Sequence, residues 1–333
     1  MKHYNIAFFI PHLGCPNKCS FCEQKSISGS SSPVLTEEIQ KTVSREADKM
    51  TEEQRKNTEI AYFGGSFTAI DKQRMLEYLT VAKELKDKYS LYGIRISTRP
   101  DALSDEILEI LKKYSVRDIE IGAQSTDDGV LFSNDRGHTK KDIFEAAERV
   151  KQHGFSLGLQ IMPGLYKDTE ETIMKTVEDV VKMAPKTVRI YPTLTIEGTR
   201  LCELYRAGEY KPLSLEKAVK LCSYMLSGFE ENNIEIIKMG LHSEKSLEKS
   251  LVAGPYHPAF KELCESRLFY DKIVDEMTKN ELQKATVFVS PKSISKALGQ
   301  KRENLKRFQD KKLNITIKTE SALGRYEIKI GKE

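Results

Sequence analysis

Three cysteines near the start of the chain are spaced as one set of ligands. Cys15, Cys19 and Cys22 form the pattern C-x3-C-x2-C directly after the apolar segment 5–10. Thiolates are soft ligands that suit iron–sulfur clusters and zinc. Gly14 and Pro16 help the loop to turn, so that the three sulfurs can approach one group. Three cysteines on a [4Fe–4S] cluster would leave one iron open to a substrate or cofactor.

Other interpretations of the cysteines stay open at this point. A zinc site would need a fourth ligand, which His12 or a distant cysteine could supply. The three thiols could also be unrelated buried groups. Cys202, Cys222 and Cys264 each stand alone in an apolar or helical context. We interpret these as packed or surface thiols, with a second cluster as the alternative.

The elements that would position the cysteine loop alternate along the chain. Short apolar segments of β-forming residues are followed by charged stretches in which an apolar residue recurs every three or four positions. The segments are 5–10, 60–67, 93–97, 118–123, 156–162 and 187–191. This alternation predicts βαβ units and a parallel sheet. We therefore expect an α/β fold, a partial (β/α)6 TIM-like barrel, followed by a small C-terminal α+β domain.

Composition restricts the class of protein. The chain has 333 residues, of which 39% are apolar and 31% charged, so it can bury a sizeable core and disorder is not expected. Its apolar runs fall far short of the ~18–20 residues that span a bilayer. The first residues lack the apolar region and cleavage site of a signal peptide. We expect a cytoplasmic protein with no membrane partner.

Charge is unevenly distributed. Residues 284–333 carry 13 basic and 5 acidic side chains, a charge of +8, whereas the rest of the chain carries −4. A basic terminal module on a near-neutral body is typical of a nucleic-acid contact, although a lysine-rich solvated surface would look the same. We expect a barrel over 1–243, an extension and linker over 244–283, and a basic module over 284–333.

The cysteine pattern after a first strand, in a chain of βα repeats, resembles the radical S-adenosylmethionine (SAM) enzymes. The resemblance implies a [4Fe–4S] cluster on Cys15, Cys19 and Cys22 that binds SAM through its amino and carboxylate groups. It also implies reductive cleavage of SAM to methionine and a 5′-deoxyadenosyl radical, with a one-electron reductant such as flavodoxin or ferredoxin as partner. In such enzymes the cofactor carries the chemistry and the protein positions and shields it.

Two further motifs resemble the SAM site of this family. Gly64 and Gly65 end the second strand, as does the family's Gly-Gly-Glu turn, whose backbone contacts the SAM ammonium. Ser66 stands at the glutamate position, so only the backbone role carries over. In the fourth unit, Gln124 and Ser125 precede Arg136, which the resemblance assigns to the SAM carboxylate because a guanidinium suits a carboxylate. Arg136 could instead be a surface arginine.

The ends of the fifth and sixth strands complete the expected cofactor site. Gln160, Arg189 and Tyr191 stand where side chains of a barrel face its open mouth. Contact with adenine or substrate and packing inside the barrel are equally compatible with these positions.

Within the radical SAM superfamily, the sequence resembles one smaller group of enzymes in particular. Four motifs together are similar to the catalytic subunit of Elongator and its bacterial relatives, which modify the wobble uridine of tRNA. The motifs are Phe63-Gly-Gly-Ser-Phe-Thr68, Ser97-Thr-Arg-Pro-Asp101, Gly122-Ala-Gln-Ser125 and Arg136-Gly-His-Thr139. Elongator's subunit also has an acetyltransferase domain, for which this chain has no room. Its acetyl-coenzyme A chemistry therefore does not carry over.

The basic segment 284–333 is predicted to form, in order, a strand, a helix, a turn, a helix and two strands. This order resembles a KH-type RNA-binding module, which clamps nucleotides against a GXXG loop. The loop here would be Gly299 to Arg302, in which Arg302 replaces the second glycine. Lys301 and Arg302 would contact phosphates. The alternative is a basic cap on the barrel.

Together these features predict a radical SAM enzyme that acts on RNA, with a tRNA uridine as the first candidate substrate. His242, His257 and Arg267 are candidates for the substrate side, or else ordinary loop and helix residues. Two rival functions stay open: a radical SAM enzyme for a small molecule or peptide, with the tail as a cap, and a non-catalytic RNA-binding protein with a structural metal.

Overall fold

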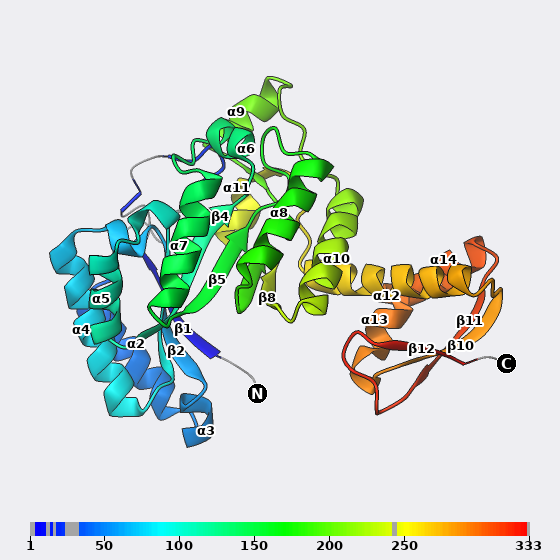
Figure 1. Ribbon diagram of the computed structural model, residues 1–333, viewed down its shortest axis with the longest axis horizontal. Helices are drawn as coiled ribbons and strands as arrows, with labels where there is room; N and C mark the ends of the chain where they lie inside the picture. The colour runs from blue at the N-terminus through cyan, green and yellow to red at the C-terminus, as the bar shows by residue number, and fades with distance from the viewer. Residues whose placement is uncertain (1–3, 11–13, 16–17, 24–32, 242–244, 332–333) are drawn as a thin grey trace.

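The computed structural model describes residues 4–10, 14–15, 18–23, 33–241 and 245–331. Its larger part is a curled, parallel seven-stranded sheet with helices on the outer face (Figure 1). Neighbouring strands follow the order β1-β2-β3-β4-β5-β6-β8, so each βα unit adds one strand to the same edge. The strands are β1 (Tyr4–Ile10), β2 (Thr58–Gly64), β3 (Gly93–Thr98), β4 (Val116–Gln124), β5 (Ser156–Ile161), β6 (Thr187–Ile190) and β8 (Glu235–Met239).

This architecture confirms the predicted partial barrel, in which a seventh strand, β8, follows the six βα units. The principal helices of the barrel are α2 (Thr36–Asp48), α4 (Lys72–Tyr89), α5 (Asp105–Lys113), α7 (Lys140–Gln152), α8 (Glu170–Met183) and α10 (Leu215–Glu231). Several begin at a hydroxyl residue that caps the first turn. Ser104 accepts a hydrogen bond from the Ile107 backbone, and Thr139 and Thr169 each form a capping box.

Short elements near the barrel mouth do not follow the βα rhythm. They are α6 (Asp128–Ser133), α9 (Arg200–Arg206), α11 (Lys245–Ser250) and a two-stranded antiparallel ribbon of β7 (Thr195–Ile196) and β9 (Leu251–Ala253), together with the 3-10 turns Phe67–Ala69 and Pro100–Ala102. A further short helix, α3 (Glu52–Arg55), lies at the opposite end of the barrel, directly before β2 (Figure 1). Of these, α6 and α9 matter most for the site, because their apolar side chains pack against the cysteine loop. Among the described residues, no helix combines the length and apolarity needed to cross a bilayer.

The C-terminal module has the predicted order of elements. β10 (Lys284–Val289) is followed by α13 (Ile294–Leu298), the turn at 300–302, α14 (Glu303–Asp310), β11 (Asn314–Thr319) and β12 (Ile328–Gly331). β10 is the central strand, parallel to β11 and antiparallel to β12. The parallel pair requires a crossover, which the two helices supply.

The helix α12 (Phe260–Lys279) joins the barrel to this module (Figure 1). It lies within the expected extension 244–283. It packs on α10 and also on the module, where Tyr270 stacks on Phe308 with ring centroids 5.2 Å apart. Phe269 lies 6.2 Å from Tyr326, also centroid to centroid. The apolar core therefore continues from the barrel through α12 into the module.

Candidate active site

A large cavity of about 870 Å³ opens at the carboxyl ends of the barrel strands. Its wall takes Phe9 from β1, Phe63 from β2, Ser97 from β3, Gln160 from β5 and Arg189 from β6. Alternate residues of a strand point to the same face of a sheet. Barrel enzymes place their chemistry at this end, and the cavity is large enough for a cofactor together with part of a substrate.

All three cysteines of the loop line this cavity. Cys19 is buried, and the backbone N–H of Cys22 donates to its carbonyl at 3.0 Å. Burial, and then the thiol of Cys19, raise the pKa of Cys15, whereas Arg99, a backbone hydrogen bond from Ser66 and Arg136 act in the opposite direction. The loop, the turn after β2 and two arginines therefore meet at one place.

The donor set suits a cluster better than a single metal ion. Within the described residues, no three His, Cys, Asp or Glu side chains are grouped closely enough to hold one ion, so the zinc interpretation gains no support. In a [4Fe–4S] cluster, each cysteine thiolate binds a different iron. The three sulfurs therefore surround the cluster, whereas the ligands of a single metal ion converge on one atom. Three cysteines at the rim of one large cavity are compatible with that arrangement.

An apolar layer packs against the loop on one side. Phe21 and Cys19 pack with Val130 of α6, Leu201 of α9 and further apolar residues, among them Leu165, Tyr210 and the partly buried Cys22. A low-dielectric shell of this kind excludes water and influences the reduction potential of a metal centre. The short helices α6 and α9 therefore contribute directly to the site.

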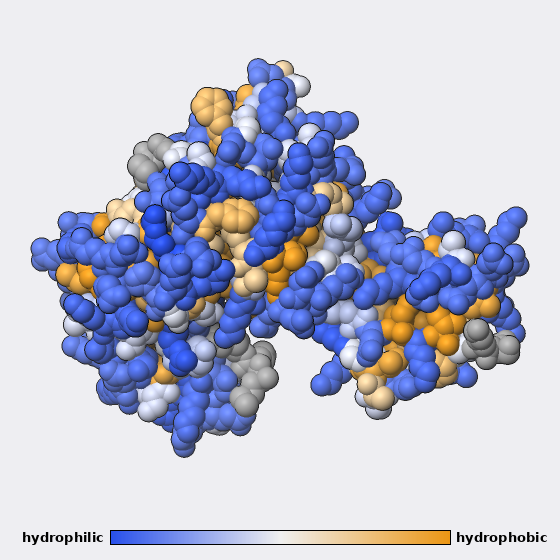
Figure 2. Space-filling model, viewed as in Figure 1, coloured by the Kyte–Doolittle hydropathy of each residue, from blue (hydrophilic) through white to orange (hydrophobic). Residues whose placement is uncertain are grey.

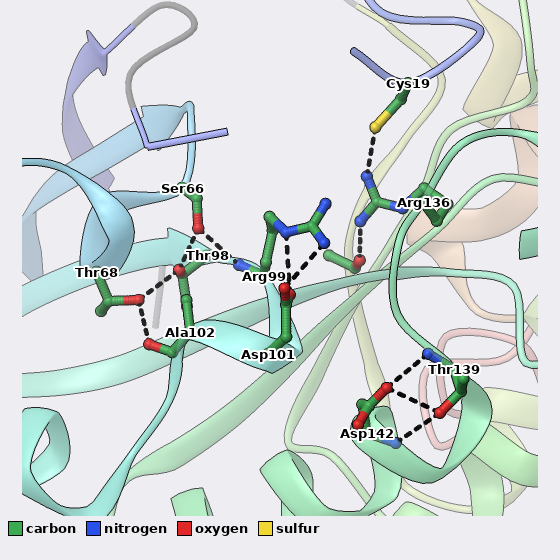
Figure 3. A network of polar contacts seen from close by, with 11 residues as sticks. Cys19, Ser66, Thr68, Thr98, Arg99, Asp101, Ala102, Arg136, Thr139 and Asp142 are labelled. Carbon is green, nitrogen blue, oxygen red and sulfur yellow. Dashed lines mark hydrogen bonds and ion pairs between the residues drawn. The ribbon is translucent and has the colours of Figure 1, made fainter. Parts of the chain in front are cut away.

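Two buried guanidinium groups lie on the other side of the loop (Figure 3). Arg136 donates from Nη1 to Cys19 Sγ at 3.1 Å and from Nη2 to the Gly122 carbonyl at 2.6 Å. Arg99 donates two hydrogen bonds to the Asp101 carboxylate, at 2.9 and 3.0 Å. Arg136 Nε and Arg99 Nη1 are buried and have no hydrogen-bond partner in the described part of the chain. A buried unpaired donor is costly, so these atoms point to a missing acceptor.

Hydroxyl groups fix the turn that follows β2 (Figure 3). Ser66 Oγ lies 2.8 Å from Thr98 Oγ1 and accepts from the Arg99 backbone N–H at 3.2 Å. Thr98 in turn lies 2.7 Å from Thr68, which donates to the Ala102 carbonyl at 2.6 Å. Ser66, at the position of the family's glutamate, thus ties the turn after β2 to the end of β3.

The deeper wall of the cavity carries an ion pair. Arg189 of β6 donates to Glu120 of β4 and to the Tyr191 hydroxyl, and its guanidinium lies 4.6 Å from the Phe63 ring centroid. Burial would lower the pKa of Arg189, but Glu120 and Tyr191 together outweigh burial, and the net direction of the pKa shift is upward. Gln160 donates to Gln124 at 3.2 Å. The end of the barrel interior is therefore polar and charged.

A second charged layer lies below the cavity. Arg95 of β3 pairs with Glu59 of β2 at 2.7 Å and with Asp118 of β4 at 3.1 Å, and all three are buried. Burial and a hydrogen bond with Glu59 raise the pKa of Asp118 to about 6, although Arg95 opposes the shift. The barrel interior is filled here by ions instead of the branched apolar residues that are common in barrels.

An apolar wall lies on the remaining side of the cavity. Leu194 and Ile196, the latter in β7, pack with Leu247 of α11, and these three residues line the cavity together with Leu241. The wall comes from the region after β6, where the alternating pattern of the sequence ends.

The structure brings most of the predicted residues to one site. The cavity lining includes Cys15, Cys19, Cys22, Gly64, Gly65, Ser66, Gln124, Arg136, Gln160, Arg189 and Tyr191. Ser125 does not line it, because its hydroxyl is turned toward Thr176 of α8, 3.4 Å away. Arg136 is not a surface residue, since it is 6% exposed.

The predicted substrate residues lie elsewhere. His257 accepts a hydrogen bond from the Ala259 backbone at the start of α12, and Arg267 pairs with Asp271 on the same helix. Neither lines the cavity. Lys301 and Arg302 are exposed on the module. His242 lies outside the described residues.

Sequence reasoning missed Arg99, Glu120 and His138. Arg99 stands inside the Ser97-Thr-Arg-Pro-Asp101 motif, which was the available signal, and Glu120 alternates with Gly122 along β4. His138 follows Arg136 by two positions and is buried. Burial and the neighbouring Arg136 and Arg99 lower the pKa of His138 to about 3, which keeps its imidazole neutral.

Comparison with known proteins agrees with this geometry. A family model described as the radical SAM superfamily matches residues 9–180, just over half of the chain. A model described as a radical SAM C-terminal domain matches residues 185–269.

Individual relatives give finer detail. A tRNA uridine(34) acetyltransferase of Methanocaldococcus infernus is 32% identical over 143 residues, which are 42% of this chain and 27% of that protein. Elongator complex protein 3 of Homo sapiens is 35% identical over 140 residues, 40% of this chain and 25% of that protein. The matched part thus spans about a quarter of the length of these relatives.

The fold also has a solved counterpart. The archaeal Methanocaldococcus infernus Elp3 with an N-terminal deletion superposes with a TM-score of 0.62 at 21% identity, covering 84% of this chain and 63% of that one. At this identity the likeness is one of fold.

Proposed function

Because the chain belongs to the radical SAM superfamily, we propose that it uses this chemistry to modify RNA, with a uridine of tRNA as its substrate. The family uses a [4Fe–4S] cluster and SAM, and the chain is an enzyme of this class. The cavity at the barrel mouth, lined by three cysteines and two buried guanidinium groups, is the observation that carries the cofactor part of the proposal.

In this proposal Cys15, Cys19 and Cys22 hold the cluster. When bound, the cluster supplies an electron, drawn from a reductant such as flavodoxin or ferredoxin, that cleaves SAM to methionine and a 5′-deoxyadenosyl radical. The backbone of Gly64 and Gly65 lines the cavity and would contact the SAM ammonium, and the hydroxyl chain through Ser66 keeps that turn in place.

The SAM carboxylate has two candidate partners. Arg99 Nη1 and Arg136 Nε are the buried donors that lack a partner among the described residues. Arg136 already uses both Nη atoms, whereas Arg99 keeps a terminal Nη free while Asp101 holds its other edge. A charge-assisted pair with a carboxylate would satisfy these atoms. We therefore add Arg99 to Arg136 at the carboxylate end of SAM.

The rest of the cavity would take the nucleoside end of SAM and the substrate. Gln124, Gln160, Arg189 and Tyr191 offer donors and acceptors on one side, and the wall at Leu194 excludes water on the other. Exclusion of water protects a reactive radical from side reactions.

The RNA part of the proposal is supported by the C-terminal module and by the names of the relatives. The relative from Methanocaldococcus infernus is named a tRNA uridine(34) acetyltransferase, but the match leaves about three quarters of its length uncovered. The module is basic and has the strand–helix–turn–helix–strand–strand order of a KH-like unit. Figure 2 shows apolar side chains gathered on the visible face of this module, bordered by hydrophilic residues.

The turn between α13 and α14 is the proposed phosphate contact. Gly299, Lys301 and Arg302 all have positive φ, at 76°, 51° and 61°. Left-handed backbone at two consecutive non-glycine residues is costly, and strain of this kind clusters at active sites and ligand-binding sites. Both side chains are exposed, so they are available to phosphates.

A charge-reversal variant tests the RNA substrate. Truncation at 284 would expose Phe269 and Tyr270, so the sharper test is Lys301→Glu with Arg302→Glu, measured as tRNA binding across a range of salt concentrations. Loss of two phosphate contacts should lower the slope of log affinity against log salt by roughly 1.4 and weaken binding sharply at low salt. Lys112→Glu with Lys113→Glu on α5 is the matched control, since both lysines are exposed and far along the chain from the module.

The outcome separates the rival functions. If the double variant binds tRNA like the parent, the module is a cap and the small-molecule or peptide substrate replaces RNA. If binding is lost selectively, nucleosides from cells that lack the protein should be missing one modified uridine by mass spectrometry.

A further inference from the structure

Arg136 makes a contact that a role in SAM binding alone does not require. Its Nη1 donates to Cys19 Sγ at 3.1 Å, in a pocket where the whole side chain is only 6% exposed (Figure 3). Its other terminal nitrogen donates to the Gly122 carbonyl at 2.6 Å, which fixes the plane of the guanidinium. The positive group is thus aimed at one of the three cysteine sulfurs.

The backbone around Arg136 is built to hold this contact. Asp135 and Gly137 on either side have positive φ, at 56° and 67°. The preceding Asn134 is fully buried, and its side chain accepts from Ser20 Oγ at 2.7 Å and donates to the carbonyls of Val130 and Tyr166.

The same corner also holds the cysteine loop. The Ser20 backbone N–H donates to the Asn134 carbonyl at 3.1 Å, and the Leu201 N–H donates to the Ser20 carbonyl at 2.8 Å. Ser20 directly follows Cys19, so Cys19 and Arg136 are fastened to one rigid corner of the chain.

We propose that Arg136 sets the reduction potential of the cluster by donating to the sulfur of Cys19. The inference rests on the proposed function, because it takes the cluster to be held by Cys15, Cys19 and Cys22. Hydrogen bonds to cluster sulfurs and nearby charge are known determinants of such potentials. One-electron reduction adds negative charge to the cluster, and a buried cation beside a ligand sulfur stabilises that charge, so Arg136 raises the potential and eases reduction.

Arg99 provides an internal comparison. It is also a buried arginine near the loop, but its charge is paired with Asp101 through two hydrogen bonds. Asp101 offsets part of its charge, and no hydrogen bond from Arg99 to a cysteine sulfur is seen in the described residues, although its charge acts on the Cys15 thiol.

The test is a redox titration of the cluster-loaded protein without SAM, followed by electron paramagnetic resonance of the reduced cluster. Arg136→Gln removes the charge and should lower the equilibrium constant of reduction at least tenfold, a fall of ~59 mV for a one-electron couple. Arg99→Gln, at a residue that is paired with Asp101 and not seen to contact a sulfur, should move the potential less. Ser20→Ala, which removes only the bond to the Asn134 side chain, should shift it slightly in the same direction as Arg136→Gln.

A second variant covers the case in which Arg136→Gln does not retain a cluster. Arg136→Lys keeps the charge but loses the two-armed contact with Cys19 and Gly122. Its cluster should therefore have a reduction potential between those of the parent and Arg136→Gln. Unchanged potentials in both Arg136 variants, or an equal shift in Arg99→Gln, would overturn the inference and leave the proposed function intact. A parent protein that holds no four-iron cluster would overturn the proposed function as well.

Discussion

Gly14 and Ser66 lie in backbone contact, which joins the cysteine loop to the turn after β2. A Cβ added to Gly14 would stand 2.3 Å from the Ser66 carbonyl oxygen and 2.7 Å from the backbone at Ala69. Gly14 also has a φ of +71°, which L-residues rarely adopt. The cysteine loop can therefore pack directly against the turn after β2, because Gly14 has no side chain.

Gly14→Ala should displace the loop, because neither backbone can give way without moving a strand end. We expect iron content after anaerobic reconstitution to fall by more than half while the circular dichroism spectrum is unchanged. Gly154→Ala is the control: its φ is +83°, but a Cβ there meets nothing within 4 Å. It should bear only the conformational cost of ~1–2 kcal/mol and retain full iron. Equal iron in both variants would mean that the contact is not needed.

Asp118 gives a prediction for the dependence of stability on pH. Its pKa is raised from 3.8 to about 6 by burial and by the bond with Glu59. As pH rises from 4 to 6, the unfolded carboxyl ionises before the folded one, so the free energy of unfolding falls in this window. Asp118→Asn can still accept from Arg95 and donate to Glu59 without a titrating proton.

The Asn variant should therefore match the parent near pH 4 and exceed it above pH 6, by on the order of 2 kcal/mol at pH 7. Thermal unfolding of the cluster-free protein between pH 4 and 8 measures this. Parallel curves for the two proteins would contradict the raised pKa.

The ion pair between Glu120 and Arg189 gives a prediction for stability in the cavity wall. Both side chains are largely buried, at 2% and 12% exposed. Glu120→Ala leaves the guanidinium without its carboxylate and should cost ~3–5 kcal/mol. Adding Arg189→Leu removes the unpaired charge and should recover part of that loss. Urea unfolding of the two variants checks this, and additive losses would show that the pair is not coupled.

Glu265 gives a prediction for the join between α12 and the module. Its carboxylate accepts from Lys296 at 2.7 Å, Arg325 at 2.9 Å and Tyr326 at 2.6 Å. Burial alone would raise the pKa of Glu265, but Lys296 and Tyr326 outweigh burial and lower it. The stability this carboxylate contributes is present above its unfolded pKa and is lost as pH falls through the lower folded value.

Glu265→Gln should loosen the module by ~1.5–3 kcal/mol, the usual worth of a hydrogen bond to a charged group. Hydrogen exchange in β10 and β12 should quicken, while exchange in β3 and β4 should not. A uniform increase across the barrel would mean that the module does not open as a separate unit.

The sequence predicted the regular part of the fold well, because burial of a parallel sheet imposes alternating apolar strands and amphipathic helices. Strands such as β3 and β5 begin at the residues expected, and the order of elements in the module is confirmed. The short helices α6 and α9 were not predicted. They are six and seven residues long, so their hydrophobic pattern is too brief to show a period.

The site was predicted where a motif stands in one stretch of sequence, as for Cys15, Cys19 and Cys22. It was missed where the residue is defined by contacts across the barrel. Glu120 resembles any charged residue in a β segment until its pairing with Arg189 is seen. In the same way, nothing near Arg136 in sequence indicates a sulfur acceptor, since Cys19 lies 117 positions away.

The central claim is that Cys15, Cys19 and Cys22 hold a [4Fe–4S] cluster that cleaves SAM. The most direct measurement is iron, sulfide and 5′-deoxyadenosine production by anaerobically reconstituted protein under dithionite, compared among single Cys→Ala variants. We predict about four iron and four sulfide per parent chain, loss of cluster and product in each variant of these three cysteines, and retention of both in Cys202→Ala and Cys222→Ala. Zinc in place of iron, or a cluster lost from a Cys202 or Cys222 variant, would contradict the account.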